Sequence, residues 1–272
     1  MNNNQEKINE KLRTIVEMKA AIITIAGISS RFNQGISPEE HILKAIYYEG
    51  NERNTLLYHM LERLYDTDVI VLVAGYKKEA LQEYIDNVLS PDMQKKIIVA
   101  VNDHYADWSS GYSLFVGIDE ALKYSPDCII FAEGDLDVDN ETLDLVNNSG
   151  KSVLTCNHDV IYSKKAVIGY RDVDGKYRYA FSTSHGAVSV DEPFTMLFNS
   201  GQIWKFTDIK LLKEANEDFE KVKETGTNLV IVADYFSKEN PDNIDFIDFK
   251  RWINCNTRED YRNILAGWEA EK

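Results

Sequence analysis

The sequence has few cysteines and few prolines. Its three cysteines, Cys128, Cys156 and Cys255, lie far apart and form no CxxC pair. An odd number at this spacing argues against a disulfide framework and against a zinc site, and it fits a reducing, cytoplasmic compartment. With only five prolines and no Pro- or Gly-rich stretch, no segment has the composition of an interdomain linker.

Basic residues and long apolar runs are also scarce. The chain has 30 Lys and Arg against 45 Asp and Glu, a formal net charge of -15. Nucleic acids and anionic membrane surfaces require a basic face, so this balance argues against both as partners. No apolar run approaches the roughly 20 residues that cross a bilayer, so membrane insertion is not expected. A cationic ligand, or an anionic ligand carried by a metal, stays compatible, although excess acid also simply favours solubility.

What the sequence does contain is an alternation of apolar, β-branched runs with amphipathic segments. Residues 20–26 form a continuous apolar run typical of a parallel strand buried on both faces. The same criteria predict further strands at 69–74, 97–101 and 128–132, and helices at 55–64, 77–89 and 112–123. This succession predicts an α/β, Rossmann-like fold, with a mainly parallel sheet flanked by helices.

After about residue 150 the pattern changes to a β-rich half. Short strands are expected at 152–156, 167–170, 177–181 and 187–190. Helices near 207–220 and 228–239, a strand at 244–248 and a helix from Thr257 complete the predicted elements. We therefore expect an N-terminal helical extension at 1–18 and one domain at 19–272, whose successive parts are 19–150, 151–250 and 251–272.

Small residues and a cation follow the first predicted strand, in the run Ala26-Gly27-Ile28-Ser29-Ser30-Arg31. Ligands of open α/β sheets bind beyond the carboxyl ends of the strands. Small residues there let backbone N–H groups approach phosphates, and the Arg31 guanidinium offers a fork suited to phosphate. An ordinary tight turn with a surface arginine explains the same residues about equally well.

Three carboxylates alternate after the strand at 128–132, namely Asp135, Asp137 and Asp139. Carboxylate oxygens suit Mg²⁺, which keeps several waters and bridges to substrate phosphates. The alternative is an acidic turn that caps the next helix. Capping is favoured for Asp139, whereas a metal site is favoured for Asp135 because it lies right at the strand end.

Three other features are ambiguous when taken singly. The polar, aromatic loop at 102–114 could read a base edge or could simply cap a helix. Lys44 lies beside an apolar run, where most lysines extend into solvent. The segment around Asn256 and Thr257 offers an oxygen ligand, but it also has the composition of a helix N-cap.

Taken in order, these features resemble nucleotidyltransferases of the GT-A-like fold. The chain is most similar to bacterial CTP:phosphocholine cytidylyltransferases and to the related phosphonate cytidylyltransferases. Five family segments have counterparts in this chain. Residues 25–32 match A-A-G-x-G-S-R-L, residues 43–46 match P-K-A-L, and residues 102–114 match N-D-x-Y-A-x-x-N-N-x-Y-S-L. Residues 134–137 match the family's acidic strand end, and residues 254–261 match E-I-D-T-x-E-D-Y. The chain departs from these patterns at Ser29, where the family has glycine, at Ser109-Ser110, where it has paired asparagines, and at Asn256, where it has an acid.

The resemblance implies a role for each matched residue. Arg31 would hold the β- and γ-phosphates and Lys44 the transferred α-phosphate, so that these two residues and Asp135 are the expected catalytic residues. Mg²⁺ would be held by Asp135 and Asn256, with Asp137 nearby. The residues expected to contact the nucleotide are Ala26, Gly27, Ser29, Ser30, Arg31, Asn102, Ser110 and Ser113.

The function implied is transfer of CMP from CTP to a small phosphorylated or phosphonylated acceptor, such as a phosphocholine-like or aminoethylphosphonate-like molecule, with release of pyrophosphate. An aromatic and acidic box of Trp204, Asp234 and Tyr235 could bind an amine on such an acceptor, although aromatic side chains are more often simply core residues. Alternatives are a sugar-1-phosphate nucleotidyltransferase, a glycosyltransferase that uses a nucleotide sugar, and a non-catalytic nucleotide-binding protein on the same fold. The oligomeric state stays open, a homodimer being one option.

Overall fold

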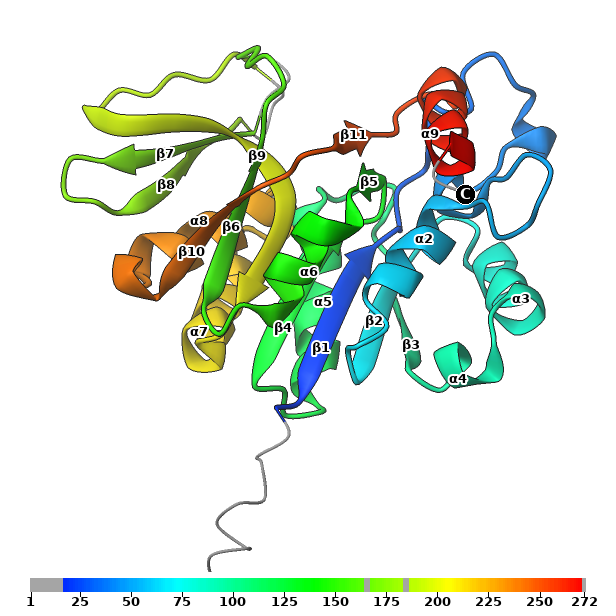
Figure 1. Ribbon diagram of the computed structural model, residues 1–272, viewed down its shortest axis with the longest axis horizontal. Coiled ribbons are helices and arrows are strands. Elements are labelled where there is room, and N and C mark those ends of the chain that lie inside the picture. Colours follow the sequence, from blue (N-terminus) through cyan, green and yellow to red (C-terminus); the bar gives the residue numbers. More distant parts are fainter. Residues whose placement is uncertain (1–16, 164–166, 183–185, 271–272) are drawn as a thin grey trace, which may run out of the picture.

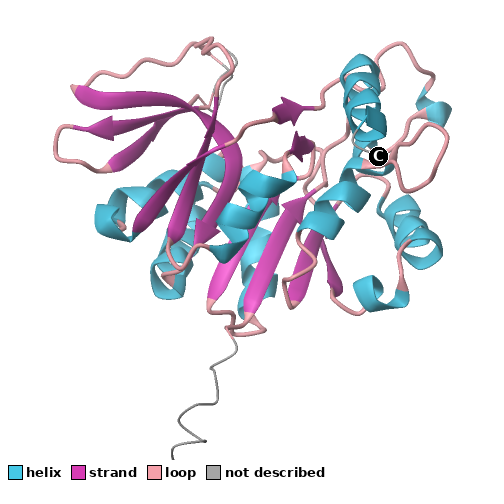
Figure 2. Ribbon diagram, viewed as in Figure 1, coloured by secondary structure: helices cyan, strands magenta, loops and turns pink. Residues whose placement is uncertain are grey.

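A mixed β-sheet with helices on both faces forms the centre of the molecule (Figures 1 and 2). The computed structural model describes residues 17–163, 167–182 and 186–270. The helix expected in the N-terminal extension falls almost entirely outside these residues. No helix in the described part of the chain is both long and apolar enough to cross a membrane.

The sheet has nine strands, seven of which follow the order β10-β6-β9-β4-β1-β2-β3. The bounds of these seven strands are β1 Lys19–Thr24, β2 Val69–Ala74, β3 Ile97–Val101, β4 Cys128–Glu133, β6 Ser152–Asn157, β9 Phe194–Phe206 and β10 Ile244–Asp248. Strands β4, β1, β2 and β3 are mutually parallel, whereas β9 runs antiparallel to both β4 and β6. The expected α/β fold with a mainly parallel sheet is therefore confirmed.

Alternate side chains of the central strands pack into two separate cores. Ala20 and Ile22 of β1 face one core, and Ala21 and Ile23 face the other, as the period-two alternation of a strand requires. The first core is covered by α5 (Gly111–Leu122), α7 (Ile209–Phe219) and α8 (Asn228–Lys238); the second is covered by α2 (Leu56–Arg63), α3 (Lys78–Val88) and α6 (Asn140–Asn148). A short helix, α4 (Pro91–Gln94), precedes β3. Because both faces are covered, the central strands β1 and β2 are almost entirely apolar.

The β-rich half differs from the prediction in one important respect. Strands β7 (Ile168–Asp172) and β8 (Tyr177–Ala180) correspond to the strands expected at 167–170 and 177–181; they pair as a hairpin, and β7 attaches to β9. Residues 187–190, however, are not a strand, and the 13-residue strand β9 was not predicted at all. The turn-like residues Asn199-Ser200-Gly201 interrupt its apolar pattern. In the structure these residues form a bulge within β9, where the register between β6 and β9 shifts.

A short antiparallel pair, β5 (Leu136–Val138) and β11 (Trp252–Asn254), returns the end of the chain to the end of β4 (Figure 1). The Cys255 N–H donates to the Asp135 carbonyl at 2.8 Å, which extends this pairing by one step. The last helix, α9 (Arg258–Ala270), then buries Tyr261, Ile264 and Trp268 in a third, smaller core. Through this return, residues 254–256 lie beside a strand end that precedes them by about 120 positions.

Candidate functional site

A cavity of about 800 Å³ lies along the carboxyl edge of the parallel strands. It extends from the end of β3, across the loop that follows β1, to the end of β4 and to the middle of β9. Its polar and charged lining residues include Ser29, Arg31, Lys44, Asn102, Ser109, Ser110, Ser113, Glu133, Asp135, Gln202, Asn228, Asn254 and Asn256. Segments far apart in the sequence therefore contribute to one site, at the sheet edge where α/β folds bind ligands.

The loop after β1 contributes Ala26, Gly27, Ser29 and Arg31 to this cavity. A Cβ atom added at Gly27 would have no neighbour within 4 Å, so packing inside the protein does not explain this glycine. The absence of a side chain leaves room for a ligand to approach the backbone. Arg31 is exposed and forms no ion pair with any residue that the structure describes. Ser30 lies in the same turn but does not line the cavity.

Ser29 adopts the left-handed conformation, with φ at 54°. This conformation costs a non-glycine residue roughly 1–2 kcal/mol, so glycine would be favoured at this point. The Ser29 hydroxyl offsets part of that cost because it accepts a hydrogen bond from the Lys44 N–H at 3.2 Å. The serine thereby attaches the loop to the short 3-10 helix η2 (Lys44–Ile46), which carries the cavity lysine.

This arrangement predicts different stabilities for two substitutions at Ser29. Ser29→Ala keeps the backbone strain and loses the hydrogen bond, so it should destabilise the fold by about 1 kcal/mol. Ser29→Gly loses the same bond but relieves the strain, so its stability should lie close to wild type. Urea denaturation of both variants measures the difference, and equal stabilities would contradict the proposed strain.

Lys44 and Asp135 form the central charge pair of the cavity, with Nζ 3.0 Å from Oδ2. Their side chains are 15% and 25% exposed, so both remain accessible to a ligand. Asp135 follows the end of β4, where Gly134 lets the chain turn sharply against β1. A Cβ atom on Gly134 would lie 2.2 Å from the Ile25 side chain. The turn therefore requires glycine, and it directs Asp135 to the sheet edge.

Three buried oxygens of the residues that line this cavity have no hydrogen-bond partner within the described part of the chain: Oδ1 of Asp135, Asn254 and Asn256. Buried polar atoms are normally paired, so three orphaned oxygens on residues that line one cavity point to a cation or to ordered water. One carboxylate oxygen and two amide oxygens form a hard donor set of the kind that suits Mg²⁺. No cluster of three or more His, Cys, Asp or Glu side chains in the described chain has a metal-binding arrangement, so a cation here depends on the two amides.

Glu133 and Asn228 were not predicted as site residues. Asn228, the first residue of α8, donates to the Glu133 carboxylate at 2.6 Å. Burial and the nearby charge of Asp135 raise the pKa of Glu133 to about 7, although the bond from Asn228 and the charge of Lys44 oppose this shift. The change from apolar to acidic residues at Ala132-Glu133 is the one signal in the sequence that could have indicated Glu133.

The predicted base-side residues, Asn102, Ser110 and Ser113, all line the cavity, and most of their described bonds stabilise the loop itself. Asn102 donates to the Ser113 hydroxyl at 2.9 Å and accepts from the His104 N–H at 2.8 Å. Trp108 stacks on His104 with ring centres 3.6 Å apart. These contacts hold the loop together, and it presents an aromatic and hydroxyl-bearing wall to the cavity.

The expectation that Asp137 lies near the metal is wrong. This residue is fully buried, does not line the cavity, and forms ion pairs with Arg63 at 3.0 Å and Arg251 at 3.1 Å. It also accepts from the Trp268 indole at 2.9 Å. Asp135 lies in the turn between β4 and β5 rather than on β5 itself, so the strand geometry that places residues two apart on one face does not extend to it. The expected capping role of Asp139 is confirmed, since its side chain accepts from the Thr142 N–H at the start of α6.

The expected acceptor box of Trp204, Asp234 and Tyr235 is also wrong. Trp204 is fully buried and donates to the Tyr179 hydroxyl at 2.7 Å. Tyr235 is equally buried and bonds to Ser152 at 2.7 Å. Asp234 pairs with Lys238 along α8. None of the three lines the cavity, because the two aromatic side chains belong to the core and the aspartate lies on the outer side of its helix.

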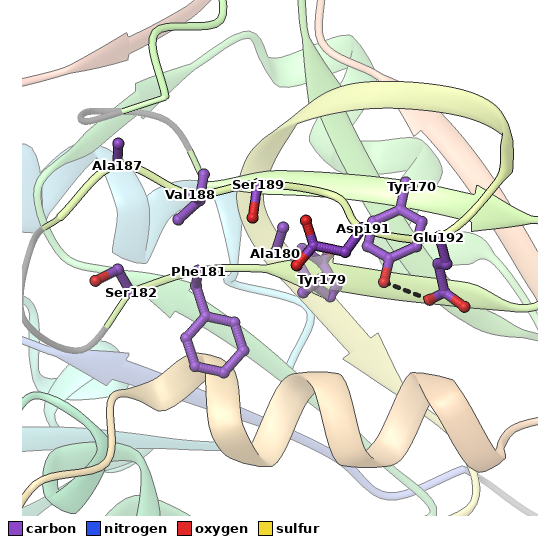
Figure 3. Close-up of a pocket in the computed structure, with 10 residues that line it drawn as sticks. All are labelled: Tyr170, Tyr179, Ala180, Phe181, Ser182, Ala187, Val188, Ser189, Asp191 and Glu192. Atoms are coloured by element: carbon purple, nitrogen blue, oxygen red, sulfur yellow. Dashed lines mark hydrogen bonds between the residues drawn. The ribbon is translucent and has the colours of Figure 1, made fainter.

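A second hollow of about 680 Å³ lies beside the β7–β8 hairpin (Figure 3). It contains tyrosines and carboxylates, but several of its polar groups already have partners. The Tyr170 hydroxyl donates to Glu192 at 2.7 Å, and Arg178 lies 3.5 Å from the same carboxylate. Among the described residues, none lines both cavities. The second hollow is therefore not an extension of the first.

Comparison with known proteins identifies the family to which this chain belongs. The family model described as a domain of unknown function, DUF6564, matches residues 40–268. The chain belongs to the DUF6564 family. Sequence comparison with curated proteins finds no match.

Solved structures that resemble this DUF6564 member include nucleotidyltransferases. The CTP:phosphocholine cytidylyltransferase of Streptococcus pneumoniae has a TM-score of 0.62 at 16% identity, with 92% of this chain and 98% of that chain covered. The inositol-1-phosphate CTP transferase of T. maritima gives 0.60 at 16%, covering 92% and 96%. A UDP-glucose pyrophosphorylase complexed with UDP-glucose gives 0.65 at 14%, covering 94% and 100%. At these identities the likeness establishes a shared nucleotidyltransferase fold.

Proposed function

We propose that this protein transfers the cytidylyl group of CTP to a small phosphate- or phosphonate-bearing acceptor and releases pyrophosphate. The observation that carries the proposal is the convergence of the open loop at Gly27, the exposed Arg31 and the Lys44–Asp135 pair on one cavity. The nucleotidyltransferase fold supports it. The choice of CTP rests on the similarity of residues 102–114 to the cytidylyltransferase loop.

In the proposed reaction an acceptor phosphate oxygen attacks the α-phosphorus of CTP. A new P–O bond forms, the bond to the β-phosphate oxygen breaks, and pyrophosphate leaves. The attacking oxygen is already ionised near neutral pH, so no general base is required. The rate then depends on positioning and on neutralising charge. Lys44 would counter charge on the transferred phosphate, and Arg31 would counter charge on the leaving group.

Mg²⁺ is the proposed cofactor. Asp135, Asn254 and Asn256 would hold it through their three unpartnered oxygens. When bound, it would neutralise phosphate charge and orient the phosphate oxygens. Lys44 neutralises Asp135, the one carboxylate of this donor set. We therefore expect tight metal binding only together with the nucleotide, because its phosphates add negative charge.

A thermal-shift and pyrophosphate-release experiment tests this proposal. In the presence of Mg²⁺, CTP at 100 times its dissociation constant should stabilise the fold by about 2.7 kcal/mol, more than the other nucleoside triphosphates at the same concentration. Addition of phosphorylated acceptors should then release pyrophosphate. Stabilisation by CTP without pyrophosphate from any acceptor would instead indicate a non-catalytic nucleotide-binding protein.

A further inference from the structure

One end of the cavity would remain free for a second substrate if the nucleotide bound at the other end. The sheet order β9-β4-β1-β2-β3 arranges the lining residues along one line. Asn102 follows β3, the phosphate-binding loop follows β1, and Asp135 follows β4. Beyond Asp135 the cavity continues to Gln202 on β9 and Asn228 on α8. If CTP occupies the part from β3 to β1, the second substrate must occupy the end formed by β9 and α8.

Gln202 reaches this end because β9 is distorted there. Its φ is 55°, a left-handed conformation in the middle of a long strand. The preceding Gly201 is packed so closely that an added Cβ would lie 2.5 Å from the Thr155 hydroxyl, and its carbonyl accepts from the Trp252 indole at 2.7 Å. The Gln202 N–H donates to the Ser200 hydroxyl at 3.1 Å. The bulge is thus held by packing and hydrogen bonds, and it positions a carboxamide at the cavity wall.

The chemistry of this end is that of amides rather than of aromatic rings. Gln202, Asn228 and Asn254 contribute three carboxamides, and Glu133 contributes one carboxylate. The Gln202 carbonyl oxygen accepts from Asn254 at a long 3.4 Å, and within the described chain its amide NH₂ group has no partner. Carboxamides both donate and accept, as hydroxyl groups do. A quaternary ammonium group instead prefers aromatic faces, and the aromatic lining residues described, Tyr105 and Trp108, lie on the nucleotide side.

We propose that the acceptor is a phosphorylated polyol or sugar, and that Gln202 and Asn228 determine its specificity by hydrogen bonding to its hydroxyl groups. This inference rests on the proposed nucleotidyl transfer. A site that hydrogen-bonds substrate hydroxyls discriminates strongly against analogues that lack them, because its polar groups are then left unpaired. Phosphorylated amines without hydroxyls should therefore be poor acceptors.

Steady-state kinetics with two panels of acceptors tests the substrate class. With saturating CTP and Mg²⁺, one panel contains glycerol, inositol and hexose phosphates, and the other contains phosphocholine, phosphoethanolamine and 2-aminoethylphosphonate. The best polyol or sugar phosphate should exceed the best amine in kcat/KM by at least about 100-fold. A preference for an amine overturns this inference and leaves nucleotidyl transfer intact. No turnover with either panel and any nucleoside triphosphate overturns the proposed function, and this inference with it.

The substitution Gln202→Met tests the assigned residue. It removes the amide and keeps the length of the side chain, so it should raise KM for the acceptor about 10- to 100-fold, as expected for one unpaired polar contact. KM for CTP should change less than twofold. The same substitution at the exposed Gln82 of α3 is the matched control. Binding is read separately, from the acceptor-induced rise in melting temperature when a non-hydrolysable CTP analogue is bound. An equal effect on both KM values would show that Gln202 is merely structural.

Discussion

Replacing Asp135 with asparagine is expected to lower kcat by about 1,000-fold while changing stability little. Asp135 carries the only negative charge among the three unpartnered oxygens of the cavity, since Asn254 and Asn256 are neutral. The variant would present three amides to a divalent cation, and it would also leave Lys44 without its carboxylate partner. Loss of one preorganised electrostatic contact to a developing charge costs about 100- to 1,000-fold in rate, and the proposed metal depends on this carboxylate.

The stability of the Asp135→Asn variant should remain close to wild type. The pair with Lys44 is partly exposed, and such pairs contribute about 0–1 kcal/mol. For a chain of this size that corresponds to a fall in melting temperature of a few degrees at most. Pyrophosphate release gives kcat, and Mn²⁺ titration followed by electron paramagnetic resonance gives the cation affinity. Retention of more than about a tenth of the wild-type rate would mean that Asp135 does not hold the metal.

The part of the site that could be predicted from the sequence consists of residues that follow the parallel strands. Arg31, Asn102 and Asp135 follow apolar runs that are readily recognised as buried strands. Because the carboxyl ends of parallel strands meet at one edge, their proximity follows from the fold class alone. Local pattern and topology were sufficient to place these residues at one edge of the sheet, whereas their expected roles came from the family resemblance.

The other half depends on antiparallel pairings between distant segments. Gln202 lines the cavity through the bulge of β9, and Asn254 through the pairing of β11 with β5. The register of such pairs is set by packing across the sheet, and this packing cannot be deduced from a single sequence. Gln202 therefore had no local signal that distinguished it from other surface amides, and Asn254 lay in a matched segment of which only Asn256 was expected to bind the metal.

The misplaced acceptor box shows how core residues can resemble a binding site. Trp204 and Tyr235 are of the residue types that bind amines, but composition alone does not distinguish a cavity wall from a core. For Tyr235 a signal was available, because Ile231, Val232, Tyr235 and Phe236 form the i, i+1, i+4, i+5 stripe of a buried helix face, and all four are buried. Trp204 could have been recognised as a core residue only if the bounds of β9 had been known, and the turn-like residues 199–201 prevented the prediction of that strand.

The same substitution two residues further along, Asp137→Asn, should have the opposite effect. It is expected to destabilise the fold by about 3–5 kcal/mol, because breaking a buried ion pair leaves uncompensated charge in the interior. Asp137 is fully buried between Arg63 and Arg251 and accepts from the Trp268 indole. The neutral amide would remove the counter-charge that Asp137 supplies to both guanidinium groups.

The consequences of Asp137→Asn follow from the elements that this carboxylate connects. Arg63 ends α2, Arg251 directly precedes β11, and Trp268 lies on α9, so a single side chain on β5 joins three separate segments. The melting temperature should fall by about 10 °C, whereas kcat measured well below that temperature should remain within about tenfold of wild type.

Asp139→Asn is the matched control for this experiment. Asparagine caps helices about as well as aspartate, and the change loses one of two bonds, from the Thr142 or the Arg251 N–H, at a cost of about 1 kcal/mol. Urea denaturation should therefore rank Asp137→Asn far below Asp139→Asn. If Asp137→Asn instead kept wild-type stability and weakened Mn²⁺ binding, Asp137 would be a metal ligand after all, and the assignment of the cation to Asp135, Asn254 and Asn256 would have to be revised.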